Sequence, residues 1–183
     1  MRYFTQELLA RCRSSDEAAA QAASDEWDAA TLAHDEAFAR IGKLMPARAR
    51  KALSKHSLHD STMIMVAVRR SRIRSAVSMY VRLEAGEVVE FKYACPITPG
   101  LEAVSLKPPT MHDPRRGQGN TRILYDEVGQ EGDRLFSHSI LLANGSEARI
   151  VFADMTVARV GYADPGRLGH AHMGAVELET ALS

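Results

Sequence analysis

Cysteine is scarce in this chain: only two of its 183 residues are cysteines, Cys12 and Cys95. They lie far apart in the sequence, whereas a zinc site is built from cysteines a few residues apart, so a cysteine-based metal site is not indicated. Two alternatives remain for this pair, one disulfide or two free thiols. Because no basic segment followed by an apolar segment begins the chain, we expect no secretory signal, and two packed thiols in a reducing cytoplasm.

The sequence also lacks a long hydrophobic run and a net charge. Its longest apolar stretch, residues 63–68, is far too short to cross a bilayer, so we predict a cytoplasmic protein with no membrane partner. Lys and Arg together number 23, as do Asp and Glu, and 45% of the residues are hydrophobic. This composition is typical of a globular protein, and the length suffices for one domain with a full core.

Common catalytic and cofactor motifs are absent as well. No Gly-x-Ser-x-Gly segment marks a nucleophilic serine. Residues 117–120 are rich in glycine but lack the lysine and the hydroxyl residue of a phosphate-binding loop. His34 has no second histidine one helical turn away, so we expect a histidine at the edge of the core and not a metal ligand. We therefore predict neither a cofactor nor a metal.

Before residue 56 the apolar side chains recur every three or four positions, which predicts helices. Thr5 is a suitable N-cap for a first helix, and an alanine-rich helical pattern extends over residues 16–43. A third, basic helix is predicted over residues 46–55. The long helix carries one face that we expect to pack on a sheet. This face consists of Trp27, Thr31, His34, Phe38 and Ile41.

After residue 60 the period changes to two, which is typical of strands. Residues 62–68 are apolar on both faces, so we predict a central strand there, and Asn144-Gly145 predicts a tight hairpin. Further strands are predicted over residues 75–83, 88–95, 101–106, 121–128, 135–142 and 148–160. Residues 107–120 read as a long loop, which is either an irregular insertion or part of a binding surface.

These patterns together predict one α+β domain over residues 1–160. Its helical part spans residues 1–56, and its sheet part spans residues 61–160. We expect the N-terminal helices to pack on a mainly antiparallel sheet of six or seven strands. Residues 161–183 are predicted to form a C-terminal extension.

Charge is distributed unevenly along the chain, because residues 41–82 carry ten basic side chains and one acidic side chain. Four of the basic residues fall in one short stretch, namely Arg69, Arg70, Arg72 and Arg74. One interpretation is a patch that binds phosphate or nucleic acid. The interpretation that we favour is a solvated connection whose arginines meet the acidic parts of the chain, since no nucleic-acid-binding motif accompanies the stretch.

The sharpest candidate for chemistry consists of Asp126, Glu127 and His138. If strands 121–128 and 135–142 pair around a turn at residues 129–133, Glu127 and His138 face each other and the carboxylate orients the imidazole. With His59 and Asp60 nearby, the group would form an acid–base or metal site. The interpretation that we favour is a cross-strand pair that stabilises the register of the sheet.

Several short motifs resemble an uncharacterised bacterial family, a domain of unknown function. Its members begin Met-Lys-Tyr-Phe-Thr-Lys-Glu, and this chain begins Met1-Arg-Tyr-Phe-Thr-Gln-Glu7. They carry a His-Asp pair between the helices and the sheet, similar to His59-Asp60. The later matches are Tyr125-Asp126-Glu127, Phe136-Ser-His138-Ser-Ile140-Leu141 and Phe152-Ala-Asp154. The resemblance covers residues 1–160 and implies the α+β fold, but it implies no activity.

A sheet that closes in this way also resembles some small immunity and interaction proteins of bacterial toxin systems. Our leading hypothesis is therefore a non-enzymatic protein-binding module, immunity-type among the alternatives, with a protein as its partner. The competing hypothesis is a hydrolase or other enzyme that uses the carboxylate and histidine group. A third hypothesis is nucleic-acid binding through the arginine stretch, which predicts affinity that falls steeply with salt. The sequence does not indicate an oligomeric state.

Overall fold

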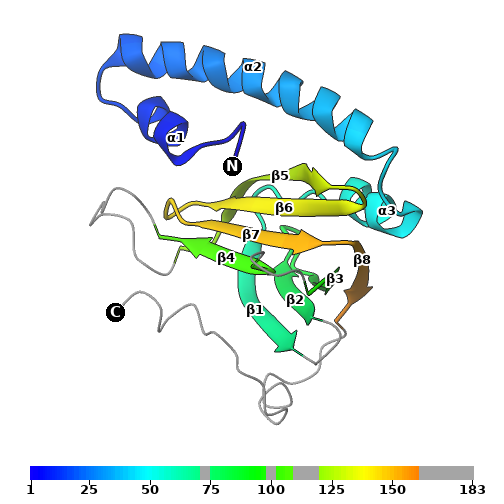
Figure 1. Ribbon diagram of the computed structural model, residues 1–183. Helices are drawn as coiled ribbons and strands as arrows, with labels where there is room; N and C mark the ends of the chain where they lie inside the picture. Colours follow the sequence, from blue (N-terminus) through cyan, green and yellow to red (C-terminus); the bar gives the residue numbers. More distant parts are fainter. Residues whose placement is uncertain (71–74, 98–101, 109–119, 161–183) are drawn as a thin grey trace.

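The fold belongs to the α+β class, with its helices at the N-terminus, as predicted. A computed structural model describes residues 1–70, 75–97, 102–108 and 120–160, and in these residues three helices precede eight strands (Figure 1). The helices are α1 (Gln6–Cys12), α2 (Glu17–Ile41) and α3 (Ala47–Lys55). The strands are β1 (Thr62–Arg70), β2 (Ser75–Arg82), β3 (Val88–Cys95), β4 (Val104–Lys107), β5 (Ile123–Gly132), β6 (Leu135–Leu142), β7 (Glu147–Phe152) and β8 (Asp154–Arg159). The predicted extension over residues 161–183 and most of the predicted loop lie outside the described residues.

Side chains that satisfy free backbone N–H groups mark the beginning of the first two helices. The Thr5 hydroxyl accepts a hydrogen bond from the Leu8 N–H at 3.1 Å. The Asp16 carboxylate accepts from the N–H groups of Ala18 and Ala19, at 3.0 and 3.3 Å. The first N–H groups of a helix have no intrahelical partner, and these side chains supply one. Local sequence therefore suffices to place the starts of α1 and α2.

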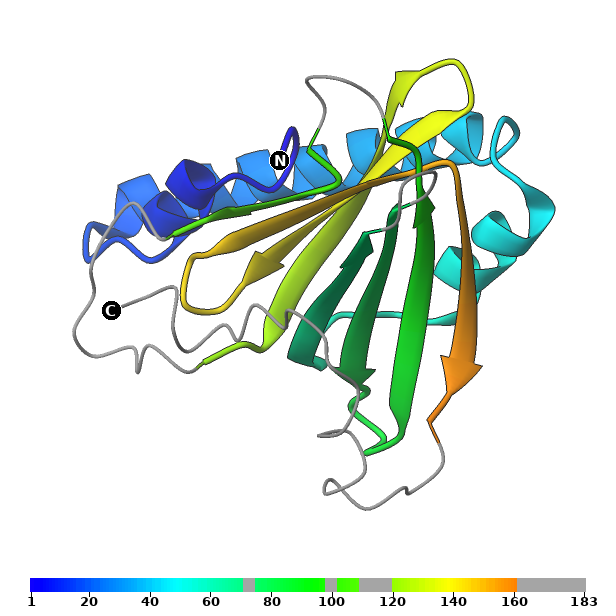
Figure 2. The same ribbon diagram turned by 60° about the horizontal axis from the view of Figure 1, so that its bottom comes forward.

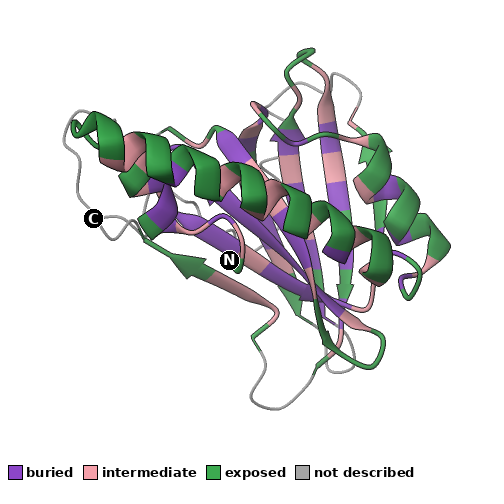
Figure 3. Cartoon of the chain, turned by 90° about the horizontal axis from the view of Figure 1, so that it is seen from above, coloured by how far each residue is buried: buried purple, intermediate pink, exposed green. Residues whose placement is uncertain are grey.

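The predicted face of α2 packs toward the second half of the chain. The Trp27 ring lies 4.7 Å from the Tyr125 ring of β5, measured between centroids. Phe38 and Ile41 pack against the main core. The opposite face of α2 is exposed, as its green outer side shows in Figure 3. The helix therefore lies on the β-structure along one stripe, as its three- and four-residue spacing predicts.

The strands form two four-stranded antiparallel sheets, which differs from the single sheet of six or seven strands that we expected. One sheet has the order β1-β2-β3-β8, and the other has the order β4-β7-β6-β5 (Figures 1 and 2). The difference arises at Ala153. Before it, β7 pairs with β6; after it, β8 pairs with β3, and the Ala153 N–H donates to the Ala94 carbonyl at 2.9 Å. The predicted strand over residues 148–160 is thus one run that changes sheets at a bend.

The two sheets are also joined at a second place, where β5 begins beside β1. Thr62 and Arg122 form an isolated antiparallel bridge. Next to it, the Ile123 N–H donates to the Ser61 carbonyl at 2.7 Å. The chain therefore connects the sheets at two corners and encloses the main core between them.

Strand β1 lies at an edge of its sheet, so the prediction of a central strand was wrong. Its pairing with β2 shifts between Met63 and Met65, which is a bulge around Ile64. Met63 and Val66 are both buried in the core, whereas Ile64 is 44% exposed. The bulge changes which alternate residues face inward between Met63 and Val66. Farther along the strand, the neighbours Val66 and Ala67 are both buried, so the apolar run reflects local burial on two faces although the strand lies at an edge.

The second sheet is the middle layer of the molecule. One of its faces meets the first sheet in a core that includes Phe91, Phe136, Ile140 and Phe152. Its other face lies under α1 and α2, where a second cluster contains Phe4, Leu9, Leu124, Leu141 and Ala143. This position explains why nearly every residue of β6 is buried. It also means that the residues of β5 alternate between two different environments, which decides the geometry of the candidate site.

Candidate functional site

The residues predicted to form an acid–base group lie on two faces of the second sheet. Asp126 faces the core between the sheets, where its carboxylate Oδ2 lies 2.9 Å from His138 Nε2. Glu127, the next residue, faces the layer that contains α1, α2 and the N-terminal segment, residues 1–5. Neighbouring strand residues point to opposite faces, so both carboxylates cannot serve the same centre.

The predicted cross-strand pair of Glu127 and His138 is wrong. Glu127 lies opposite Ser139, and His138 lies opposite Val128. The reason is a register shift between Gln130 and Gly132, near the end of the hairpin. Without that one-residue bulge, the pairing would place Glu127 on the same face as His138. The partner of His138 is therefore Asp126, which lies diagonally across the ladder.

His138 is fully buried and has a hydrogen-bond partner at each ring nitrogen. Its Nδ1 lies 2.8 Å from the Tyr93 hydroxyl, and its Nε2 meets Asp126. Burial, and then the negative charge of Asp126, raise the pKa of Tyr93 well above its ordinary value. Tyr93 therefore keeps its proton, and its hydroxyl is available to donate a hydrogen bond to Nδ1 of His138, with Asp126 as the acceptor at Nε2. We interpret this chain as a satisfied polar network within the core.

His59 and Asp60 form a separate pair at the surface. His59 Nδ1 lies 3.0 Å from Asp60 Oδ2, and Arg122 lies 3.5 Å from the other carboxylate oxygen. The His59 ring contacts the ring of Tyr125. Tyr125 lies on the same side of β5 as Glu127, and the buried network lies on the opposite side. The five candidate residues are thus divided among three places, and they do not assemble one acid–base centre.

Only part of the basic stretch lies in the described residues. Arg69 and Arg70 are exposed at the end of β1, whereas Arg72 and Arg74 lie outside the described part. Arg70 also lines a groove of about 280 Å³ between β1 and the region around β4. These positions agree with a solvated strand end and do not test nucleic-acid binding.

A larger cleft, of about 560 Å³, lies where the N-terminal segment, the end of α2 and the second sheet meet. This volume falls within the range of roughly 300–1,000 Å³ that small-molecule and cofactor sites occupy. The described residues that line it come from the N-terminal segment, the end of α2 and the strands β5, β6 and β7. They are Met1, Arg2, Tyr3, Ala37, Arg40, Ile41, Leu44, Glu127, Val128, Gly129, Gln130, Glu131, Ser137, Ser139 and Arg149.

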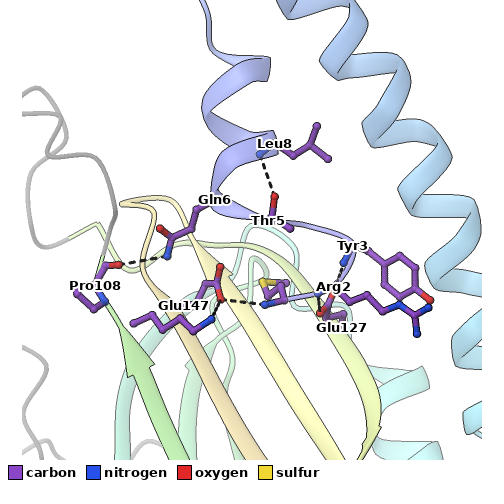
Figure 4. A network of polar contacts seen from close by, with 10 residues as sticks. Arg2, Tyr3, Thr5, Gln6, Leu8, Pro108, Glu127 and Glu147 are labelled. Atoms are coloured by element: carbon purple, nitrogen blue, oxygen red, sulfur yellow. Dashed lines mark hydrogen bonds and ion pairs between the residues drawn. The ribbon is translucent and has the colours of Figure 1, made fainter.

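Glu127 holds one wall of the cleft in place. Its buried carboxylate accepts hydrogen bonds from the backbone N–H of Arg2 and from that of Tyr3, the latter at 2.9 Å (Figure 4). Just after this segment, at the first residue of α1, Gln6 Nε2 donates to the Pro108 carbonyl at 3.4 Å. Both oxygens of Glu127 are thus occupied by the protein itself, and they position the N-terminal segment against β5.

The second carboxylate of the cleft, Glu131, is also occupied. It accepts from the Ser137 hydroxyl at 2.6 Å and pairs with the Arg149 guanidinium at 2.5 Å. Burial acts to raise the pKa of Glu131, but the hydrogen bonds from Ser137 and Arg149 outweigh it and hold that pKa below its ordinary value. Glu131 therefore stays ionised, and the positive charge of Arg149 balances its negative charge.

Two arginines of the cleft have no such partner. Among the described residues, no carboxylate forms an ion pair with Arg2 or Arg40. The Arg2 guanidinium lies over the Tyr3 ring, 5.4 Å from its centroid, on the side toward α2 (Figure 4). Arg40 belongs to the last turn of α2. Beside them, Leu44 is 59% exposed. The cleft thus combines available positive charge with apolar surface.

The sequence interpretation missed this cleft, although two of its motifs contribute to it. The motif at Met1–Glu7 and the motif Tyr125-Asp126-Glu127 lie in contact, and the rings of Phe4 and Tyr125 stack with centroids 4.6 Å apart. The available signal was the presence of aromatic and charged residues in both motifs. The sequence alone did not indicate that the motifs are in contact, because they are far apart in the chain.

Fold and site together define an α+β protein with an arginine-lined cleft on the helical side of its second sheet. Within residues 1–70, 75–97, 102–108 and 120–160, no three His, Cys, Asp or Glu residues gather in a way that suits a metal ion. No helix in that same part has the length and apolar character needed to cross a membrane. Comparisons with family models, with curated proteins and with solved structures found no match. The family resemblance stays a prediction.

Proposed function

We propose that this chain is a non-enzymatic protein-binding module and that the cleft is its recognition site. The observation that carries the proposal is the combination of Arg2, Arg40 and Leu44 at one cleft. Two arginines that have no ion-pair partner in the described part of the chain stand beside an exposed leucine, while the two carboxylates of the cleft are occupied by the protein. Arginine beside apolar surface is the composition that protein interfaces favour.

The separation of the candidate catalytic residues supports the same proposal. A general base must reach its substrate within hydrogen-bond distance. His138 is fully buried between Tyr93 and Asp126, and neither of the two cavities described above is lined by any of these three residues. The geometry therefore favours binding over the hydrolase alternative.

An immunity-type role is the finer form of the proposal. It predicts a single partner, bound in a fixed ratio, and not a set of weak partners. The uneven charge of the chain suits such a role, because complementary charge accelerates association and selects among partners. The experiment must therefore report both where the partner lies and how many partners there are.

The test is site-specific photo-cross-linking in native lysate. A benzoylphenylalanine replaces Leu44 at the cleft, and in the matched control it replaces Leu32, which is 69% exposed on α2 and does not line the cleft. We expect one cross-linked protein, in a fixed ratio, from position 44 and none from position 32. No adduct at position 44, or the same adducts at both positions, would contradict the proposal.

A further inference from the structure

Resting on the proposed function, we infer that the cleft recognises an acidic segment of a partner protein. Carboxylate side chains of that segment pair with Arg40 and Arg2, and its apolar side chains pack on Ile41 and Leu44. This assigns a ligand chemistry to the cleft, which the proposed function leaves open.

The charge balance of the cleft is the first step of the argument. Its described lining contains three arginines and two carboxylates. Both carboxylates accept hydrogen bonds from the protein, and Arg149 is committed to Glu131. The charge that remains is that of Arg2, Arg40 and Glu127, a net charge of +1, because the hydrogen bonds to Glu127 come from neutral backbone groups. An incoming carboxylate therefore meets two guanidinium groups, whose planar donors match carboxylate geometry, while both oxygens of Glu127 are engaged by the N-terminal backbone.

The apolar part of the lining is the second step. Ile41 and Leu44 follow Arg40 along the chain, and Ala37 and Val128 line the same cleft. Burying the exposed Leu44 side chain would be favourable by about 25 cal/mol per Å² of apolar surface removed from water. A simple anion cannot provide that burial, whereas a peptide with leucine-like side chains beside its carboxylates can. The mixed lining therefore favours an acidic peptide over a free phosphate.

The anchoring of the N-terminal segment is the third step. Glu127 accepts the backbone N–H groups of Arg2 and Tyr3, so the position of the Arg2 side chain depends on a carboxylate of β5. The Tyr3 ring lies beside the Arg2 guanidinium and restricts it further. Glu127 is therefore a positioning residue for the cleft, because it orders one of the two arginines before a partner arrives and reduces the entropy lost on binding.

The inference is tested with two fluorescein-labelled peptides, Leu-Glu-Leu-Glu-Leu and Leu-Gln-Leu-Gln-Leu. Each has a C-terminal amide, so the peptide parts differ in side-chain carboxylates only. Fluorescence anisotropy with the full chain measures both affinities at low and at physiological salt. We expect the glutamate peptide to bind at least about tenfold more tightly, with a difference that shrinks as salt rises. We expect an excess of inorganic phosphate to displace no more peptide than sodium chloride does at the same ionic strength.

Charge variants locate the effect. Arg40→Glu is expected to weaken binding of the glutamate peptide by about tenfold or more, and Arg40→Gln to weaken it less, because glutamine adds no repulsion. Arg82→Glu is the matched control, since Arg82 is exposed on β2 and does not line the cleft. We expect that control to bind the peptide as tightly as the unmodified chain. Circular dichroism confirms that each variant is folded.

The outcomes separate this inference from the proposed function. Equal affinity for both peptides, no binding of either, or displacement by phosphate beyond that caused by sodium chloride at the same ionic strength overturns the acidic segment. So does a cross-link at position 44 that persists unchanged in the Arg40→Glu chain, although the binding module itself then stands. Loss of that cross-link in Arg40→Glu, with retention in Arg82→Glu, supports both. If position 44 gives no cross-link in the chain that has no arginine substitution, the proposed function is overturned.

Discussion

The carboxylate of Glu127 holds the backbone N–H of Tyr3 at 2.9 Å, although the two residues are separated by 124 positions in the sequence. This contact ties the N-terminal segment to β5 and closes one side of the cleft. It also removes Glu127 from the acid–base group in which the strand pattern had placed it. We therefore expect Glu127 to contribute both to the stability of the fold and to partner binding in the cleft.

Replacing Glu127 with glutamine is expected to destabilise the fold by about 1–3 kcal/mol. Glutamine retains one acceptor oxygen, so one of the two partly buried N–H groups loses a charge-assisted hydrogen bond. Urea denaturation measures the change in the free energy of unfolding. Glu84→Gln serves as the control, because Glu84 is exposed, and we expect it to change stability by less than about 0.5 kcal/mol. Equal effects of the two substitutions would contradict the role of Glu127.

Removing the hydroxyl group of Tyr93 is expected to cost about 1–3 kcal/mol, because Tyr93→Phe leaves the buried Nδ1 of His138 without a partner. The control is Tyr80→Phe. Tyr80 donates to Glu90 at 3.0 Å but is only partly buried, so water can replace its bond and the loss should be smaller. Thermal and urea unfolding of both variants provide the comparison. A larger loss in Tyr80→Phe would show that the buried network is not a major source of stability.

Stability is expected to fall as the pH rises above about 9. Burial raises the pKa of the Cys95 thiol from 9.0 to about 12. Between these values the unfolded chain has lost the proton and the folded chain keeps it, so the contribution is complete below pH 9 and disappears toward pH 12. Urea denaturation at several pH values should show a shallower alkaline decline in Cys95→Ala. Parallel pH profiles for the variant and the unmodified chain would refute this prediction.

Adding a methyl group at Gly129 is expected to destabilise the hairpin by about 1–3 kcal/mol. A Cβ atom there would lie 2.7 Å from the Ser137 hydroxyl oxygen, which also donates to Glu131. Gly132→Ala is the matched control on the same strand, because a Cβ at that position meets no atom within 4 Å. Denaturation midpoints of the two variants provide the measurement. The prediction fails if Gly132→Ala is as destabilising as Gly129→Ala.

The secondary structure was predictable to a large extent because its signals are local. The caps at Thr5 and Asp16 lie within three residues of the N–H groups that they satisfy. The predicted ranges for β3 and β6 agree with the structure. In β3 the reason is an apolar–polar alternation that is complete within one strand. The stripe that includes Trp27 faces the sheet for the same reason: its spacing matches the turn of a helix.

The candidate site was less predictable because small backbone irregularities decide it. One bulge near Glu131 moves His138 to the face of Asp126, and a bend at Ala153 sends β8 into another sheet. Neither irregularity changes the alternation that the sequence displays on either side of it. The cleft adds a further difficulty, because Arg2, Arg40 and Glu127 belong to three separate segments.

By itself, the sequence determined the α+β class, the helix starts and most strand positions, because these depend on propensities and spacings among near neighbours. Only the tertiary structure decided the division into two sheets, the partner of His138 and the existence of the cleft. Those features depend on register and on long-range contacts, in which a shift of one residue exchanges the two faces of a strand and therefore changes which charged groups meet.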